Sequence, residues 1–328
     1  MAAAPDDGPI GAKHGTREVV PLDVTVLAGG ISAEREVSLE SGKAVHKAML
    51  RLGHRSTLRD IGPDDLSALD MRADFVFVAL HGEFGEDGTV QEELERRGLC
   101  YGGSGPEASR VAMDKVEAKR RFEQAGIPTP RWMAVDLDEA IESAPPFTVP
   151  AVVKPVASGS SVDTTIERTP RGLDGAIATV ITRHGAALVE EYITGPELTV
   201  GILGDSALPV CRIVSAREFY DYQAKYVNDD TRYLFDCDLP AKLLERVQTL
   251  SLEAHRVLGC EAFSRVDWMV DEKTLEPFVL EVNTIPGFTS HSLLPKAAGR
   301  IGLSFDDLCA RIIELSQDRR RVSTTDEA

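Results

Sequence analysis

The sequence predicts an α/β fold, α+β overall, that begins with a parallel sheet. Residues 23–28 form a short apolar run that ends in Gly29-Gly30, and residues 75–80 form a second that ends at His81-Gly82. Each run has the length of a buried strand and stops at a turn signal. Apolar residues recur at helical spacing between them, at Val37, Val45, Ala48 and Met49. Strand–helix–strand alternation favours parallel strands, with ligands near the strand ends that carry the two glycine loops.

The later elements follow from the same signals. Asp114 is a candidate N-cap for a helix that reaches about Gln124, before Gly126. The polar segment 218–238 has weak periodicity and predicts a long surface loop, a frequent place for a lid. Apolar runs predict strands at 149–153, 188–192, 198–203, 210–214 and 262–266, and helical patterns cover 241–258 and 305–315.

Composition limits the possible partners. The chain has 328 residues and a formal net charge of −17, which argues against nucleic acid or an anionic membrane as a partner. Its five cysteines are scattered without a CxxC pair, and no apolar run is long enough for a membrane span. A cytoplasmic protein is therefore expected. Residues 1–20 are expected to form a disordered tail, and residues 319–328 a polar tail.

The most informative stretch lies near the C-terminus, where Arg265 and Asp267 precede Glu281 and Asn283 across a polar turn. Side chains two apart on a strand share a face, so Glu281 and Asn283 project together. Asp267 is expected to end its own strand. Two carboxylates and an amide oxygen on adjacent strands are hard donors that suit Mg²⁺. The alternative is an ordinary hairpin with solvated acids.

Three further stretches are candidates for ligand binding. Lys154 ends a buried strand and precedes Gly159-Ser160-Ser161, whose backbone N–H groups could hold phosphate. The strand end at residues 190–193 could frame a purine, and Glu197 could hold ribose hydroxyls. Glu34 lies where a helix begins and could meet an ammonium group. A flexible turn, surface acids and a plain helix cap are the respective alternatives.

Together, these stretches resemble the D-alanine–D-alanine ligases of the ATP-grasp superfamily, from about Val24 to Leu315. Their joint order is more specific than any single motif. The resemblance is carried by Gly29-Gly30-Ile31-Ser32-Ala33-Glu34, His81-Gly82-Glu83-Phe84-Gly85-Glu86-Asp87-Gly88, Met113-Asp114-Lys115, Gly159-Ser160-Ser161, Tyr220-Asp221-Tyr222-Gln223-Ala224-Lys225-Tyr226, Arg265-Val266-Asp267 and Glu281-Val282-Asn283.

The resemblance implies a three-domain ATP-grasp architecture, with domains at residues 21–105, 106–190 and 191–318, and ATP held between the second and third. It also implies ATP-dependent joining of two D-alanines through an acyl phosphate, for peptidoglycan synthesis, by a homodimer. ATP would contact Lys115, Lys154, Ser160, Glu190, Glu191, Tyr192, Ile193, Glu197 and Lys225. Two Mg²⁺ ions, with Mn²⁺ as a substitute, would be held by Asp267, Glu281 and Asn283.

The resemblance also assigns residues to the D-alanine substrates. Catalytic roles fall on Glu34, Ser161, Tyr226, Arg265 and the Gly287 backbone, and substrate contacts on His81, Ser292 and Leu293. Tyr226 and Leu293 favour D-alanine at the second site, although a sibling ligase that joins D-alanine to another D-amino or hydroxy acid stays open. A non-catalytic ATP-binding regulator is the other alternative. The chain departs from the family pattern at Ser158, Asp163, Glu92 and Trp268, which bears on affinity and rate.

Overall fold

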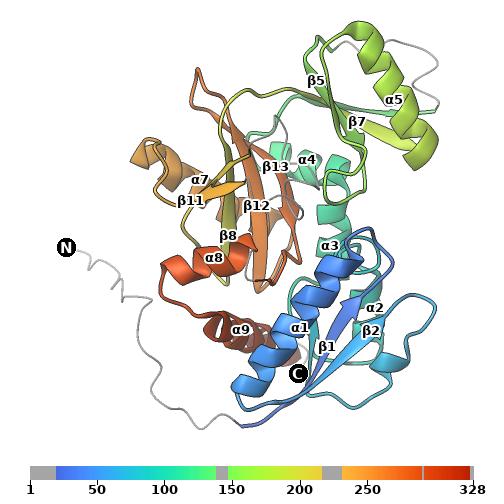
Figure 1. Cartoon of the computed structure of the whole chain (residues 1–328), viewed down its shortest axis with the longest axis vertical. Helices are drawn as coiled ribbons and strands as arrows, with labels where there is room; N and C mark the ends of the chain where they lie inside the picture. Colours follow the sequence, from blue (N-terminus) through green and yellow to red (C-terminus); the bar gives the residue numbers. More distant parts are fainter. Residues whose placement is uncertain (1–19, 138–146, 216–230, 290–291, 326–328) are drawn as a thin grey trace.

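The computed structural model describes residues 20–137, 147–215, 231–289 and 292–325, with side chains described as far as residue 317 (Figure 1). This part of the chain is built around three sheets, with three, four and six strands. In the view of Figure 1 the first lies at the lower right, the second at the upper right and the third in the centre.

The first sheet is parallel, as the sequence predicts. β1 (Asp23–Gly29) pairs with β2 (Arg55–Ile61) on one side and with β3 (Phe75–Val78) on the other. Helix α1 (Arg35–Arg51) buries the four apolar residues expected to face the core, at Val37, Val45, Ala48 and Met49. The 3₁₀ turn η1 (Ser67–Leu69) and helix α2 (Thr89–Arg96) complete the unit. Because β1 and β3 are parallel neighbours, the loops that follow their C-terminal ends place Glu34 and His81 at the same edge of this sheet.

The second sheet is antiparallel and has its own core. It contains β4 (Trp132–Asp136), β5 (Ala151–Pro155), β6 (Thr165–Glu167) and β7 (Ala186–Glu191). Helix α5 (Pro170–His184) covers one face (Figure 1). Its side chains Leu173, Ile177, Val180 and Ile181 meet Val135, Ala151, Val153, Ala187 and Val189 of the sheet.

The third sheet carries most of the candidate site. Its strands are β8 (Glu197–Leu203), β9 (Ser206–Ala207), β10 (Cys211–Val214), β11 (Arg232–Leu234), β12 (Phe263–Val270) and β13 (Pro277–Asn283). Helices α3 (Pro106–Met113), α4 (Lys115–Gln124) and α7 (Ala241–Val257) contribute to its buried core. The Asp114 side chain accepts the N–H groups of Val116 and Glu117, at 3.0 Å each, which confirms the predicted N-cap.

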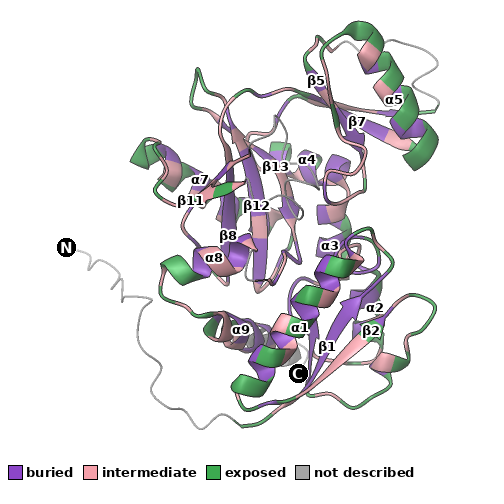
Figure 2. Ribbon diagram, in the orientation of Figure 1, coloured by how far each residue is buried: buried purple, intermediate pink, exposed green. Residues whose placement is uncertain are grey.

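One hydrophobic core joins the first sheet to the third. Phe288 follows β13, and its ring meets Phe77 of β3 and Phe263 of β12 edge to face, with centroids 5.3 and 5.4 Å apart. Helices α8 (Leu293–Arg300) and α9 (Phe305–Thr325) add buried residues to the same core. Figure 2 shows that β1 is almost entirely buried in this part of the molecule. The N- and C-terminal parts of the chain are thus packed as one unit.

Three expectations are corrected. Strand β12 does not end at Asp267 but continues to Val270, because Trp268 and Val270 are fully buried on the face opposite Asp267. Strand β11 lies within the expected loop 218–238, and residues 216–230 fall outside the described residues. Helix α9 extends to Thr325, through most of the expected tail 319–328, because no glycine or proline interrupts it. The three-domain division stays a prediction, although α3 and α4 pack with the third sheet.

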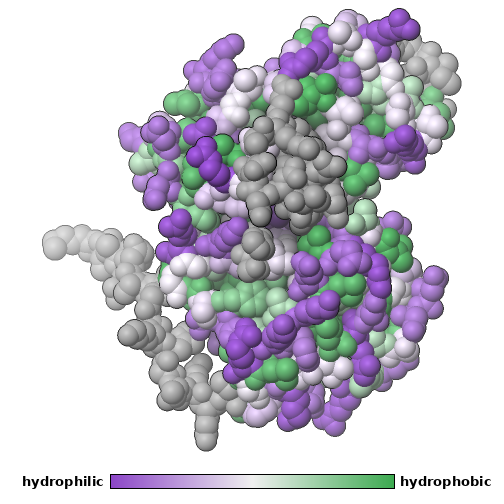
Figure 3. Space-filling model, in the orientation of Figure 1, coloured by the Kyte–Doolittle hydropathy of each residue, from purple (hydrophilic) through white to green (hydrophobic). Residues whose placement is uncertain are grey.

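In the part of the chain that the structure describes, no helix combines the length and apolar character required to cross a bilayer. Figure 3 shows that hydrophilic side chains prevail on the visible face of both the upper and the lower lobe.

Candidate active site

Four chemistry-bearing side chains form two cross-strand pairs on β12 and β13. In this antiparallel ladder Arg265 lies opposite Asn283, and Asp267 lies opposite Glu281. Residues two apart on a strand share a face, so all four side chains project from the same side of the sheet. Val282 is buried on the other side, as expected. The strand alternation that the sequence predicted is therefore confirmed here.

Protein donors surround the Asp267 carboxylate. Oδ1 accepts from Thr199 Oγ1 at 2.6 Å and from Arg265 Nε at 2.9 Å. Oδ2 accepts from Arg265 Nη2 at 2.7 Å and from Asn283 Nδ2 at 3.0 Å. Charge-assisted bonds of this kind fix both the carboxylate and the guanidinium. Arg265 is thus held rigidly beside the carboxylate.

The donor set fits a magnesium ion by its chemistry. Asp267 and Glu281 supply carboxylate oxygens, and Asn283 gives its amide nitrogen to Asp267, which leaves its carbonyl oxygen as the third hard donor. No group of three or more histidine, cysteine, aspartate or glutamate side chains suited to a metal occurs among the described residues. A two-carboxylate set matches Mg²⁺, which is usually bound by one or two carboxylates together with waters and substrate phosphates.

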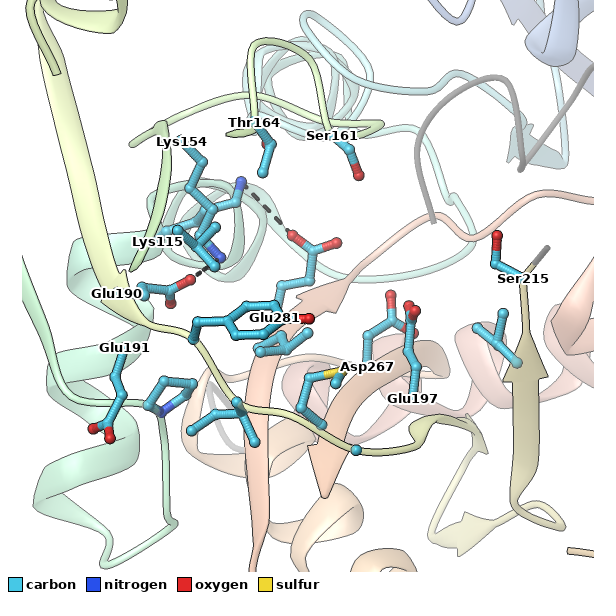
Figure 4. Close-up of a pocket in the computed structure, with 18 of the residues that line it drawn as sticks. Lys115, Lys154, Ser161, Thr164, Glu190, Glu191, Glu197, Ser215, Asp267 and Glu281 are labelled. Carbon is cyan, nitrogen blue, oxygen red and sulfur yellow. Dashed lines mark ion pairs between the residues drawn. The ribbon is translucent and has the colours of Figure 1, made fainter. Parts of the chain in front are cut away.

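A cavity of about 300 Å³ opens in front of these strands, between the second and third sheets. Figure 4 shows Lys115, Lys154, Glu281, Asp267 and Glu197 around it. Charged and polar side chains surround it, and Met269, Leu280, Ile213 and Val152 supply apolar walls. A cleft that combines apolar walls with convergent charged groups is suited to bind a charged ligand. The predicted residues that line it are Lys115, Lys154, Ser161, Glu190, Glu191, Tyr192, Ile193, Glu197, Asp267 and Glu281.

Within the lining of this cavity, a buried carboxylate lies between two lysines. Glu190 Oε1 is 2.5 Å from Lys119 Nζ, and Glu190 Oε2 is 2.6 Å from Lys154 Nζ. Burial alone would raise the pKa of Glu190, but the two ammonium groups together outweigh it and lower the pKa. Burial lowers the pKa of Lys119 to about 8. Lys119 was not among the predicted residues, although its position four residues after Lys115 on one helix was a signal.

Lys115 joins the two sides of the larger cavity. Its ammonium donates to the Ser158 carbonyl at 2.6 Å and lies 3.7 Å from Glu281 Oε2. Its backbone N–H also bonds the Val156 carbonyl at 3.0 Å. The loop after β5 is thereby tied to the start of α4, which places the loop over the cavity.

A second, smaller cavity of about 60 Å³ is lined by Arg265 of β12 and Asn283 of β13, from the same face of the ladder. The predicted residues that line it are Glu34, His81, Ser160, Arg265, Asn283, Gly287, Ser292 and Leu293. Asp267 lines the larger cavity, and Arg265, two residues earlier on β12, lines the smaller one, so the two cavities are neighbours along β12. Chemistry that links a ligand in one cavity with a ligand in the other would take place beside this pair.

The loop after β5 reaches the smaller cavity through Ser160, whose hydroxyl bonds Glu34. A Cβ added to Gly159 would lie 2.8 Å from Glu34 Oε2, so a larger residue there would require the Glu34 side chain to shift. Ser160 was expected at ATP and Ser161 beside Glu34, but Ser160 lines the smaller cavity and Ser161 the larger. Both serines have positive φ, at 50° and 56°. The backbone turns sharply here, and the two side chains therefore enter different cavities.

Two predicted residues cannot be placed, since Lys225 and Tyr226 lie outside the described residues. Glu86 is a further residue of the candidate site, and it is named from the sequence only within the motif at residues 81–88. Glu86 lines the smaller cavity, and burial, together with the nearby Glu34 charge, raises its pKa to about 8.

The four departures from the family pattern each have a structural partner. Trp268 is buried and donates to Ser251 Oγ at 2.8 Å, on the face away from the cavities. Asp163 pairs with Arg183 and His184 of α5, at 2.8 and 2.7 Å. Glu92 pairs with Arg110 at 2.9 Å, and the Ser158 carbonyl accepts from Lys115.

Comparison with known proteins agrees with this geometry. The family described as "D-ala D-ala ligase C-terminus" matches residues 122–314. D-alanine–D-alanine ligases from Bordetella avium and Albidiferax ferrireducens are 43% and 44% identical, over 88% of this chain in each case and 93% and 86% of theirs.

Solved structures give the same result. A D-alanine–D-alanine ligase from Bacillus anthracis complexed with ATP superposes with a TM-score of 0.78 at 33% identity, covering 92% of this chain and 99% of that one. The ligase from Coxiella burnetii superposes with a TM-score of 0.81 at 26% identity, over 93% and 96%.

The likeness to these solved structures identifies the fold as that of an ATP-dependent ligase of the ATP-grasp class. Within it, the chain belongs to the D-alanine–D-alanine ligase family.

Proposed function

We propose that this protein joins two D-alanines into D-alanyl-D-alanine with ATP, for peptidoglycan synthesis. The observation that carries the proposal is the presence of two neighbouring cavities along one strand face, one lined by Asp267 and the other by Arg265, which form an ion pair. Family membership at 43–44% identity supports the reaction, and the two cavities support a site for it beside β12.

In the proposed reaction, a carboxylate oxygen of the first D-alanine attacks the γ-phosphorus of ATP, and ADP leaves. The amine of the second D-alanine then attacks the acyl phosphate carbon, and inorganic phosphate leaves. Negative charge develops on the carbonyl oxygen in that second step. Arg265 and the Gly287 N–H are assigned to this oxygen, since both line the smaller cavity. Glu34 is assigned to the ammonium group of the first D-alanine.

ATP is assigned to the larger cavity. Lys115 and Lys154 would meet its phosphates, residues 190–193 its adenine and Glu197 its ribose, as the resemblance implies. Lys154 pairs with Glu190 in this structure, and Lys119 lies on the other side of that carboxylate. Lys119 would therefore keep Glu190 neutralised when Lys154 turns to phosphate.

Asp267, Glu281 and Asn283 are proposed to hold Mg²⁺, in two ions, with Mn²⁺ as a substitute. A bound divalent cation would neutralise phosphate charge. The variant Glu281→Gln should weaken metal affinity, which is measured by the Mg²⁺ concentration for half-maximal activity. Partial recovery at high Mg²⁺ is expected, and an unchanged metal titration would count against ligation.

The direct test of function is phosphate release from ATP with identification of the product. D-alanine should stimulate release and give the dipeptide, whereas L-alanine should not substitute. D-Serine and D-lactate, offered with D-alanine as second substrates, distinguish a sibling ligase. ATP binding without D-alanine-stimulated turnover would instead support the regulatory alternative.

Two further assignments also come from the family and from composition. We propose a homodimer in the cytoplasm. Sedimentation equilibrium at micromolar concentration would show a mass twice that of the 35.6 kDa chain, and a single-chain mass would contradict it.

A further inference from the structure

We propose that Ser41, His81 and Glu86 form a backbone clamp that positions the Gly287 N–H for the oxyanion. The inference rests on the proposed function, because it assigns positioning residues to that reaction. All three residues lie outside the β12–β13 ladder, and they hold the segment 285–288 that follows it.

Three hydrogen bonds make up the clamp. Glu86 Oε1 accepts the Ile285 N–H at 3.0 Å, and His81 Nδ1 bonds the Ile285 carbonyl at 3.0 Å. Ser41 Oγ accepts the Phe288 N–H at 3.2 Å. The segment is therefore bonded at Ile285 and at Phe288, with Gly287 between them. Ser41 is fully buried, and His81 is 3% exposed.

The direction of every hydrogen bond in this network follows from its chemistry. A carbonyl only accepts, so His81 must donate from Nδ1 to Ile285. Nε2 of the neutral ring then accepts from the Ser41 hydroxyl at 3.1 Å. Burial lowers the pKa of His81, which supports the neutral ring. The chain runs from the Phe288 N–H to the Ser41 hydroxyl, on to the His81 ring and finally to the Ile285 carbonyl.

This network gives His81 a different task from direct substrate contact. Its ring lines the smaller cavity, but both ring nitrogens are bonded to protein groups. The histidine therefore acts through the backbone of the segment 285–288. Glu86 strengthens the same attachment, because its second oxygen accepts the Gly82 N–H at 2.8 Å and so fixes the loop that carries His81.

Positioning of this kind matters because an oxyanion donor acts only when it is already in place. The clamp joins residues separated by 199 to 247 positions in the sequence. The ring of Phe288 lies in the core shared with β3 and β12, which prevents the C-terminal end of the segment from shifting. Loss of one clamp bond should displace Gly287 without removing any group that binds ATP.

The test compares Ser41→Ala with Ser38→Ala. Ser38 is a matched control, since it is also buried on α1 and also forms one accepted and one donated hydrogen bond, with Gly29 N–H and the Ala79 carbonyl. Those bonds stay within the first sheet. Ser41→Ala is expected to lower kcat of D-alanine ligation by roughly 10- to 100-fold, less than complete loss of an oxyanion donor.

The KM for ATP should stay within about twofold in both variants, and their melting temperatures should fall by similar amounts. Equal kcat values for Ser41→Ala and Ser38→Ala would overturn the clamp. Absence of D-alanine-dependent turnover in the unmodified protein would instead refute the proposed function, so the two failures are distinguishable.

A second pair of variants tests the direction assigned to His81. An asparagine amide can reach the Nδ1 position and donate to Ile285, whereas a glutamine amide reaches toward the Nε2 position. His81→Asn should therefore retain several-fold more kcat than His81→Gln. The opposite order would contradict the clamp, since it would show that the Nε2 side matters more.

Discussion

The β2-β1-β3 sheet and the β4-β7-β5-β6 sheet flank the same candidate site, but they are attached to the rest of the molecule differently. The first shares an apolar core with β12, α8 and α9, in which Phe288 bridges Phe77 and Phe263. The second encloses its own core with α5. Polar contacts connect it across the site, at Lys119–Glu190, Lys115–Ser158 and Glu34–Ser160.

The two kinds of attachment imply different roles for the first and second sheets. An apolar core cannot open without exposing its surface to water, whereas polar groups that separate can bond to water or ligand instead. The first sheet and the β12–β13 ladder should therefore act as one rigid support for the reacting groups. The second sheet should be the part that moves when ATP binds and leaves.

The largest expected effect comes from Phe288→Ala, which removes the bridge of the shared core. We expect a loss of about 3–5 kcal/mol in the free energy of unfolding. Hydrogen exchange should accelerate together in β1, β3 and β12. Leu173→Ala in the core of the second sheet is the matched variant, with faster exchange confined to β4–β7 and α5. Equal acceleration in β1 after Leu173→Ala would contradict the comparison.

Arg265→Ala should separate chemistry from ATP binding. Loss of one donor to the oxyanion lowers kcat by roughly 10²–10³, while the Kd for ATP should stay near normal because the lysines are unaffected. Lys154→Ala on the second sheet should chiefly raise the Kd for ATP. Steady-state kinetics and ATP titration measure both, with Arg246→Ala as a control, because Arg246 pairs with Glu276 away from either cavity. Near-normal turnover in Arg265→Ala would refute the role.

Titration of Glu86 should make the free energy of unfolding depend on pH. Burial raises its pKa to about 8 from an ordinary 4.5, so the folded protein keeps a proton that the unfolded chain has released. The contribution to the free energy of unfolding is complete below the pKa of Glu86 in the unfolded chain, and it is lost as the pH rises through the pKa of Glu86 in the folded protein. The slope of this loss is at most about 1.4 kcal/mol per pH unit. Urea unfolding between pH 5 and 8 should show a smaller slope for Glu86→Gln than for the exposed control Glu92→Gln. Equal slopes would exclude this titration.

The smallest effect is expected from Asp163→Asn. Its partners Arg183 and His184 lie at the surface of the second sheet unit, where such pairs contribute about 0.2–1 kcal/mol. The KM for ATP should change less than about threefold. A tenfold rise would show that this pair holds the loop after β5 in place for ATP.

The sequence predicted the ladder residues because strand alternation is local. Arg265, Asp267, Glu281 and Asn283 lie on one face as expected. The continuation of β12 to Val270 differs from the prediction, which ended the strand at Asp267. The alternation of buried Val266, Trp268 and Val270 was the available signal.

The groups that sequence reasoning missed depend on contacts across the fold. Ser41 meets Phe288 over 247 positions and Glu86 meets Ile285 over 199. No local pattern distinguishes such a serine from an ordinary helical one. Lys119 has a local signal, its spacing from Lys115 on α4, but its partner Glu190 is distant in the sequence, on β7 of the second sheet.

The second sheet begins and ends at adjacent points. Trp132 at the start of β4 pairs with Glu190 near the end of β7, and the Glu191 N–H bonds the Arg131 carbonyl at 2.8 Å. The chain thus passes into and out of this unit side by side, as in an inserted cassette. A unit joined in this way can swing as a body about two neighbouring stretches of backbone, and the equivalent segment of a relative could be exchanged for it without cutting the shared core.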